Sequence, residues 1–148
     1  MNDLEFVQQL MRANSDSLGF IPISSVNRAY GDGRLLIHAV NNERVGYLLF
    51  GPIRKEKDVT IWQLCTTQKE RGKGVGRNLL NRLQEIASKA GAKGIRLRCA
   101  EDLPANHFWE ATGFRVISTV CCKNIRHRRI HIYYLPFNRS QFREVDGC

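Results

Sequence analysis

The spacing of hydrophobic residues predicts two helices at the start of the chain. Four apolar residues recur at helical spacing there: Leu4, Val7, Leu10 and Met11. They predict a helix over residues 2–13. Pro22 is well placed to begin a second helix over residues 23–30.

The next part of the chain changes to strand-like patterns. Apolar runs at residues 35–40 and 44–50 flank the turn-forming residues 41–43, which predicts a β-hairpin. Residues 59–66 are rich in β-branched and aromatic side chains and predict a further strand.

A long amphipathic helix is predicted from Val75. Its apolar face is formed by residues at a period of about 3.6: Val75, Leu79, Leu83, Ile86, Ala87 and Ala90. Gly91 suits the position just beyond the end of a helix.

Three strands and a short helix are expected after it. Residues 92–100 predict a strand and residues 102–113 a short helix. Two longer strands, residues 114–122 and 130–137, are joined by a basic turn at residues 123–129.

This order of elements predicts a mixed sheet with helices packed on it, an α/β (mixed α+β) fold. We expect one domain over residues 1–148, with N-terminal helices in 1–34, a sheet core in 35–137 and a polar tail in 138–148.

Composition narrows the class of protein. Hydrophobic residues make up 43% and charged residues 25%, which is ordinary for a soluble globular protein. Apolar runs are far shorter than the roughly 18 residues of a membrane span, and a secretory signal is not visible at the N-terminus. We therefore expect a cytoplasmic location. Cys65, Cys99, Cys121 and Cys122 lie in strand-like stretches without metal-ligand spacing; we expect buried free thiols and no metal.

The formal net charge of +9 favours an anionic ligand. Nucleic acid, a phosphorylated cofactor and an acidic substrate all fit that charge. The basic residues gather in two places, residues 69–77 and residues 123–129.

The first basic cluster surrounds a glycine loop, residues 71–77, with the sequence Arg-Gly-Lys-Gly-Val-Gly-Arg. Its glycines let backbone N–H groups approach a bulky anion, and the helix that follows adds unpaired N–H donors. The loop fits neither the P-loop nor the dinucleotide-binding fingerprint. A simple turn into the helix is the alternative, but a turn does not need so many cations. We therefore predict a diphosphate cradle.

Two motifs in this order resemble the GNAT acyltransferase superfamily. Arg71, Gly74 and Gly76 meet the family pattern Arg/Gln-x-x-Gly-x-Gly/Ala. Residues 108–114, Phe-Trp-Glu-Ala-Thr-Gly-Phe, match a second family segment, a short helix with an aromatic residue and a terminal Gly-Phe. The resemblance covers about residues 35–137. It implies a mostly antiparallel, splayed sheet with helices on both faces.

The resemblance also implies a reaction, the transfer of an acetyl group from acetyl-CoA to an amine that attacks the thioester directly. Backbone groups of the strand before the loop would hold the thioester. The cofactor-binding residues implied are Leu64, Cys65, Thr66, Arg71, Gly72, Lys73, Gly74, Val75, Gly76, Arg77, Asn106 and Trp109.

The chain departs from the family where many relatives carry a tyrosine that acts as the general acid. Trp109 stands there, and an indole N–H is not a proton donor near neutral pH. The weak candidates for catalysis are Asp102, which could instead cap the short helix, and Tyr133 and Tyr134, of which one should point inward and one outward. The catalytic residues stay unassigned.

The acceptor is open at this stage. In such folds the loop between the last strands lies near the acceptor, which places Arg126, Arg128 and Arg129 on that side. A solvated turn is the alternative reading. Besides an amine acceptor, two hypotheses remain: a nucleic acid acceptor (charged tRNA or a DNA base) and a non-catalytic CoA-binding module. The protein would be a monomer or a homodimer without membrane partners.

Overall fold

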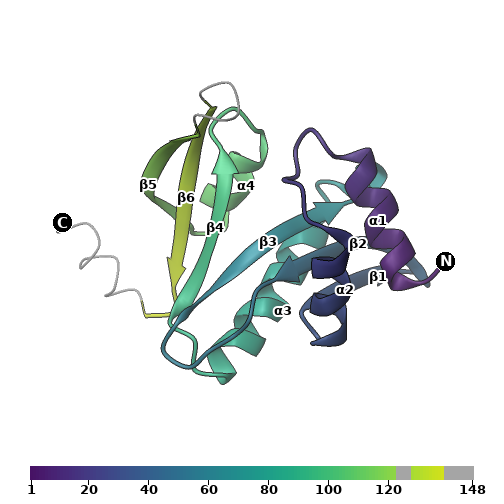
Figure 1. The fold of residues 1–148 in the computed structure, drawn as a ribbon, viewed down its shortest axis with the longest axis horizontal. Coiled ribbons are helices and arrows are strands. Elements are labelled where there is room, and N and C mark those ends of the chain that lie inside the picture. The colour runs from purple at the N-terminus through teal and green to yellow at the C-terminus, as the bar shows by residue number, and fades with distance from the viewer. Residues whose placement is uncertain (123–127, 139–148) are drawn as a thin grey trace. The chain divides into compact units, whose positions relative to one another are not determined.

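The computed structural model describes residues 1–122 and 128–138. The predicted elements are present, with small shifts at their ends (Figure 1). In chain order they are α1 (Asp3–Ala13), α2 (Ile23–Gly31), β1 (Leu35–Val40), β2 (Glu43–Phe50), β3 (Asp58–Thr66), the 3-10 helix η1 (Gln68–Glu70), α3 (Val75–Lys89), β4 (Gly94–Ala100), α4 (Ala105–Ala111), β5 (Arg115–Cys122) and β6 (Arg128–Pro136).

The strands form a mixed, mostly antiparallel sheet in the order β1-β2-β3-β4-β6-β5. Its one parallel ladder among the described strands joins β3 and β4, from Asp58 opposite Gly94 to Thr60 opposite Arg96. The predicted hairpin is β1 and β2. Its turn residues Asn41 and Asn42 both have positive φ, 51° and 65°, as a tight hairpin turn requires.

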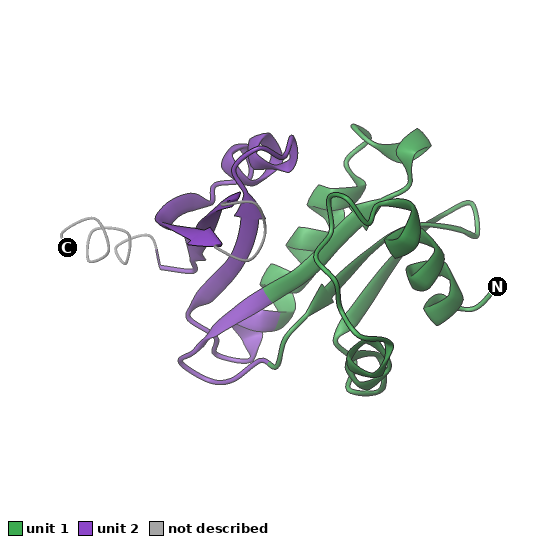
Figure 2. Cartoon of the chain, turned by 45° about the horizontal axis from the view of Figure 1, so that its top comes forward, with its two compact units in different colours: residues 1–52, 61–86 green, residues 53–60, 87–148 purple. Residues whose placement is uncertain are grey.

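The chain divides into two compact units, which Figure 2 shows in different colours. Unit 1 comprises Met1–Pro52 and Ile61–Ile86, and unit 2 comprises Ile53–Thr60 and Ala87–Cys148. Strand β3 and helix α3 each contribute residues to both. The glycine loop and the end of β3 belong to unit 1, whereas α4 and β6 belong to unit 2.

Helices cover both faces of the strands in unit 1. Phe6 and Val7 of α1 and Val26 of α2 share one hydrophobic cluster with Tyr47 and Cys65, which fixes these helices on the first face. On the opposite face Gly46 lies under α3. A Cβ atom at that position would come within 2.8 Å of Val75 Cγ1 and 3.4 Å of Leu79 Cδ1. The start of α3 therefore packs directly on strand backbone.

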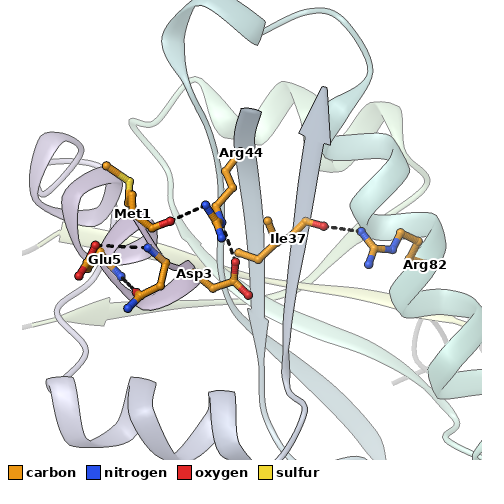
Figure 3. A network of polar contacts seen from close by, with 7 residues as sticks. Met1, Asp3, Glu5, Ile37, Arg44 and Arg82 are labelled. Atoms are coloured by element: carbon orange, nitrogen blue, oxygen red, sulfur yellow. Dashed lines mark hydrogen bonds and ion pairs between the residues drawn. The ribbon is translucent and has the colours of Figure 1, made fainter. Parts of the chain in front are cut away.

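Polar contacts fix two of these helices further (Figure 3). Arg44 of β2 donates from Nε to Asp3 Oδ1 at 2.6 Å and from Nη1 to the Met1 carbonyl at 2.7 Å. On α3, Arg82 Nη1 donates to the Ile37 carbonyl of β1 at 2.9 Å. The start of α1 and the middle of α3 are thus each tied to strand backbone or to a strand side chain.

The sequence wrongly predicted two residues, Ile86 and Ala90, as part of the buried apolar face of α3. Ile86 is 41% exposed and Ala90 lies exposed beyond the end of the helix, whereas Leu80 is buried. On a helical wheel Leu80 and Ile86 flank the face centred on Leu83. Periodicity could not tell which flank is covered.

Three expectations about unit 2 also need correction. Arg128 and Arg129 do not lie in the turn but in β6, opposite Cys122 and Cys121; residues 123–127 lie outside the described residues. Cys121 is exposed, because β5 is the outermost strand, and only Cys65 and Cys99 are buried thiols; Cys148 lies outside the described residues.

The third correction concerns the adjacent tyrosines of β6. Both Tyr133 and Tyr134 are buried, at 0% and 5% exposure, although neighbouring residues of a strand point to opposite faces. Strand β6 lies between β4 and β5, and both of its faces are covered at this point. The expectation of one inward and one outward tyrosine was therefore wrong.

Candidate functional site

Glycine shapes the loop that connects β3 to α3 in unit 1. Gly72 and Gly74 have φ angles of +79° and +87°, a region that other residues adopt only with strain. Beyond Gly74 the chain enters α3 at Val75. The predicted loop and helix start are therefore confirmed, and two of the three glycines are explained by their backbone conformation.

The loop leaves backbone donors free at the helix start. The Asn78 N–H donates to the Gly74 carbonyl at 3.0 Å. Because this bond spans one helical turn, the N–H groups of Val75, Gly76 and Arg77 precede it and have no acceptor within the helix. They form a group of neighbouring donors at the positive end of the α3 dipole, the arrangement that binds phosphate.

The three predicted cations of the loop are all exposed, but they differ in their partners. Lys73 forms an ion pair with Glu70 at 3.7 Å. Arg71 donates from Nη2 to Asn14 Oδ1 at 2.7 Å and from Nε to the Thr66 carbonyl at 3.3 Å. Arg77 lies on the first turn of α3 itself. Lys73 and Arg77 thus keep positive charge next to the free N–H groups along the chain, whereas the Arg71 side chain is directed to Asn14 and Thr66.

The register of β2 and β3 shows which way the backbone of β3 points. The Thr67 N–H donates to the Val45 carbonyl. Bonded and non-bonded pairs alternate in an antiparallel ladder, so Cys65 bonds with Tyr47. Leu64 and Thr66 then direct their N–H and C=O groups away from β2. Of the three residues expected to hold a thioester, these two have backbone groups facing away from their partner strand.

Cys65 behaves differently from its neighbours because its side chain enters the core of α1 and α2. Burial raises the pKa of the Cys65 thiol, and the nearby Arg71 guanidinium opposes that rise without cancelling it. A buried, protonated thiol is a poor nucleophile. Cys65 is therefore a packing residue.

In unit 2, Asn106 is the centre of a closed hydrogen-bond network, which we call the α4–β6 cluster (Asn106, Glu110 and Tyr133). Asn106 Nδ2 donates to the carbonyls of Leu103 at 2.7 Å and Ala100 at 2.8 Å. Tyr133 Oη donates to Asn106 Oδ1 at 2.7 Å and lies 3.4 Å from Glu110 Oε1. Burial, followed by the Glu110 carboxylate, raises the pKa of Tyr133 to about 12. This tyrosine stays protonated at neutral pH.

Two further predicted site residues of unit 2, Trp109 and Tyr134, also contact other side chains of that unit. Trp109 is buried in edge-to-face contact with Phe108 and Phe114, with ring centroids 4.9 and 5.3 Å apart. Tyr134 lies under the Arg96 guanidinium, 5.4 Å from its ring centroid.

The acidic and basic residues flanking this cluster pair with each other. Asp102 pairs with Arg128 at 3.1 Å and Glu101 with Arg129 at 3.0 Å. Asp102 does not cap α4, whose N-cap is Pro104, so that alternative is wrong. Arg126 lies outside the described residues.

No three His, Cys, Asp or Glu side chains in residues 1–122 and 128–138 come together in a way that could hold a metal ion. Within the same ranges, none of the helices has the length and apolar character needed to cross a membrane.

Comparison of the chain with known protein families shows which family it belongs to. The family described as Acetyltransferase (GNAT) family matches residues 5–114, most of the chain. The chain belongs to the GNAT acetyltransferase family. It is therefore an N-acetyltransferase that uses acetyl-CoA, and the hypothesis of a non-catalytic module is set aside. None of the curated proteins that were compared matches it.

Solved structures share the GNAT fold at low identity. Naa50 of Arabidopsis thaliana with the bisubstrate analogue CoA-Ac-MVNAL has 22% identity and a TM-score of 0.74, covering 93% of this chain and 95% of that one. Ribosomal-protein-alanine N-acetyltransferase from Brucella melitensis has 18% identity and a TM-score of 0.72, covering 91% and 94%. An aminoglycoside 6'-N-acetyltransferase with coenzyme A has 13% identity and a TM-score of 0.76, covering 90% and 89%. At these identities the likeness shows the fold, and the names already span different acceptors.

Sequence reasoning missed two residues beside the GNAT loop. Glu70 balances Lys73, and Asn14 accepts a hydrogen bond from Arg71 across 57 positions of sequence. Glu70 stands within the basic stretch and could have been found by pairing charges at helical spacing. Nothing in the sequence around Asn14 indicates its partner.

Proposed function

We propose that unit 1 holds acetyl-CoA along the end of β3 and the glycine loop, and that the chain transfers the acetyl group to an amine. The observation that carries this assignment is the set of free N–H groups at Val75, Gly76 and Arg77, reached through the positive-φ glycines 72 and 74. Family membership supports acetyl-CoA as the donor of the acetyl group.

The diphosphate of the cofactor fits the loop chemically. Adjacent N–H donors at a helix start and the Arg77 and Lys73 charges together match a compact anion with several acceptor oxygens. These donors are held by backbone, so they need little ordering when the ligand arrives.

The pantetheine arm and thioester are assigned to the end of β3. The N–H and C=O groups of Leu64 and the N–H of Thr66 face away from β2 and can pair with the amides of the arm, as an added strand would. A backbone N–H at this position can stabilise the oxyanion that forms when the thioester carbonyl is attacked.

The proposed reaction is direct. The neutral amine nitrogen forms a bond to the thioester carbonyl carbon, and the carbon–sulfur bond then breaks. The nitrogen loses one proton and the departing thiolate of coenzyme A gains one, so the products are an amide and free coenzyme A. Neither proton transfer is assigned to Asp102, Tyr133 or Tyr134, because each already has a partner within unit 2.

The acceptor is proposed as an amine-bearing molecule. The pairing of Arg128 with Asp102 and of Arg129 with Glu101 weakens the case for a nucleic acid acceptor, because these two cations are already balanced. A nucleic acid would still show itself as salt-sensitive binding. Labelled acetyl-CoA incubated with the protein and a cell lysate, then fractionated into protein, RNA, DNA and small molecules, identifies the acceptor class.

Isothermal titration with acetyl-CoA tests the assignment of the loop. Two charge reversals on one helix make a matched pair: Arg77→Glu on the first turn of α3 and Lys89→Glu on its last. We expect Arg77→Glu to weaken acetyl-CoA binding roughly tenfold or more, because it places a negative charge beside the diphosphate, and Lys89→Glu to leave it unchanged. Equal effects of both, or no binding of acetyl-CoA by the wild-type protein at millimolar concentration, would refute the proposal.

A further inference from the structure

The guanidinium of Arg71 already serves two acceptors within unit 1. Nη2 donates to Asn14 Oδ1 at 2.7 Å and Nε donates to the Thr66 carbonyl at 3.3 Å. One acceptor belongs to the end of α1 and the other to the end of β3. Because the guanidinium is planar and rigid, holding both acceptors restrains the positions of these two ends.

Asn14 is itself held in place, so the contact is directed. Asn14 Nδ2 donates to the Leu10 carbonyl at 2.9 Å, and its backbone N–H donates to the Met11 carbonyl at 3.3 Å. Asn14 is thus the C-cap of α1. With the amide nitrogen committed to Leu10, the amide oxygen is left to accept from Arg71.

The position of Arg71 along β3 supports the same reading. Its guanidinium lies against the Cys65 thiol as well as the Thr66 carbonyl, which places the charge over the last residues of the strand. Those residues include the ones assigned above to the thioester. The free N–H groups of the loop start farther along the chain, at Val75.

We propose that Arg71 is a positioning residue, which braces the end of α1 through Asn14 against the thioester-holding end of β3, and that it is not a ligand of the cofactor phosphates. This inference rests on the proposed site for acetyl-CoA and refines the part that Arg71 plays in it. Its consequence is specific: loss of Arg71 weakens the binding of the thioester arm whether or not phosphates are attached to it.

The test compares two ligands, acetyl-CoA and S-acetyl-pantetheine, which carries the thioester arm without phosphate. Both are titrated by ligand-observed NMR against the wild-type protein, Arg71→Gln, Asn14→Ala, the double variant and Arg77→Gln. We expect Arg71→Gln to weaken both ligands by a similar factor, roughly 10-fold to 100-fold, as for a lost charge-assisted hydrogen bond. Asn14→Ala should weaken both about tenfold, and the double variant no more than Arg71→Gln alone. Arg77→Gln should weaken acetyl-CoA only.

Two further measurements separate a brace from a merely structural effect. Asn14→Asp keeps the oxygen acceptor for Arg71 and should bind both ligands within about threefold of wild type. The dependence of the acetyl-CoA dissociation constant on salt should keep its wild-type slope in Arg71→Gln and become shallower in Arg77→Gln, because only the latter removes a phosphate contact.

The outcomes that overturn the inference differ from those that overturn the proposed site. An Arg71→Gln protein that loses affinity for acetyl-CoA but not for S-acetyl-pantetheine, or that has a shallower salt dependence, would make Arg71 a phosphate ligand. Additive losses in the double variant would mean that Asn14 does not act through Arg71. A wild-type protein that binds neither ligand refutes the proposed acetyl-CoA site itself.

Discussion

The glycine loop of unit 1 and the α4–β6 cluster of unit 2 both gather polar groups at a helix, but they leave those groups in opposite states. The loop presents the N–H groups of Val75, Gly76 and Arg77 without acceptors in the helix. In the cluster, Tyr133 donates to Asn106, which donates in turn to backbone carbonyls. The first arrangement is ready to bind a ligand, and the second is satisfied by the protein itself.

Polar groups near a site act differently when the protein has already satisfied them and when it has left them open. A buried polar group that is fully hydrogen-bonded adds to the rigidity of its own unit, and removing a partner leaves an uncompensated group. A donor held by backbone and left open costs little until a ligand uses it. Changes in the cluster should therefore appear as lost stability, and changes in the loop as lost affinity.

The largest effect is expected for Asn106→Ala. The substitution removes the closer of two acceptors for the Tyr133 hydroxyl, leaving Glu110 Oε1 at 3.4 Å, and the donor for the Ala100 and Leu103 carbonyls. The free energy of unfolding, measured by urea denaturation, should fall by about 2–4 kcal/mol.

Asn27→Ala on the exposed side of α2 is the matched control and should change stability by no more than about 0.5 kcal/mol. An Asn106→Ala protein that keeps its stability but loses affinity for acetyl-CoA would contradict this expectation. Asn106 would then belong to the cofactor site, as the resemblance of the chain to the GNAT superfamily implies.

Tyr133→Phe is expected to change how the stability of the protein depends on pH. Burial raises the pKa of Tyr133 from its ordinary value of 10.0 to about 12. The folded state therefore holds the proton more tightly, and this stabilisation is fully present below pH 10 and lost as the pH rises through about 12. The loss amounts to roughly 2–3 kcal/mol for the wild-type protein and is absent from the variant.

The readout is the difference in unfolding free energy between the two proteins. Near neutral pH the variant should be less stable by about 1 kcal/mol, the cost of a hydrogen bond. Between pH 10 and 12 that difference should shrink and reverse. Burial also raises the pKa of Tyr47, but Tyr47 is present in both proteins and cancels. A difference that stays constant with pH would show that Tyr133 does not titrate there.

Gly74→Ala tests the open region. The added Cβ meets nothing within 4 Å, but the φ of +87° is strained for alanine, so the loop should relax and redirect its N–H groups. We expect acetyl-CoA affinity to fall about tenfold, measured by calorimetry, and stability to fall by about 1 kcal/mol.

Gly33→Ala is an equivalent substitution in the turn before β1. Its φ is +76° and its Cβ would also meet nothing within 4 Å. It should lose similar stability and keep full affinity. Equal loss of affinity in both variants would mean that the loop has no special role.

The sequence predicted features that depend on neighbours along the chain. The Asn41–Asn42 turn, the glycine loop and the start of α3 all follow from local rules of backbone conformation. The contacts of Asn14 with Arg71 and of Asn106 with Tyr133 join residues 57 and 27 positions apart, and no local pattern encodes them. The same limit explains why periodicity placed Ile86 in the core instead of Leu80.

The sequence motifs predicted the acetyl-CoA-binding loop more completely than the residues that move protons in the reaction. The Arg71 to Gly76 pattern spans a loop with positive-φ glycines and the first residues of α3, as predicted. Around Trp109 the motif does not say which groups move protons. Here Trp109 is packed against Phe108 and Phe114, and the Tyr133 hydroxyl of β6 already donates to Asn106.

The smallest effect is expected for Asp102→Asn. The Asp102 side chain is 70% exposed and its ion pair with Arg128 is solvent-screened, so stability should change by no more than about 0.5 kcal/mol. If Asp102 only balances Arg128, kcat and KM with the identified acceptor should stay within about twofold of wild type. A fall in kcat of about 100-fold with KM unchanged would instead identify Asp102 as the base. That result would mean that unit 2 also carries a catalytic group. The contrast between a ligand-binding unit 1 and a unit 2 whose polar groups are satisfied internally would then no longer hold.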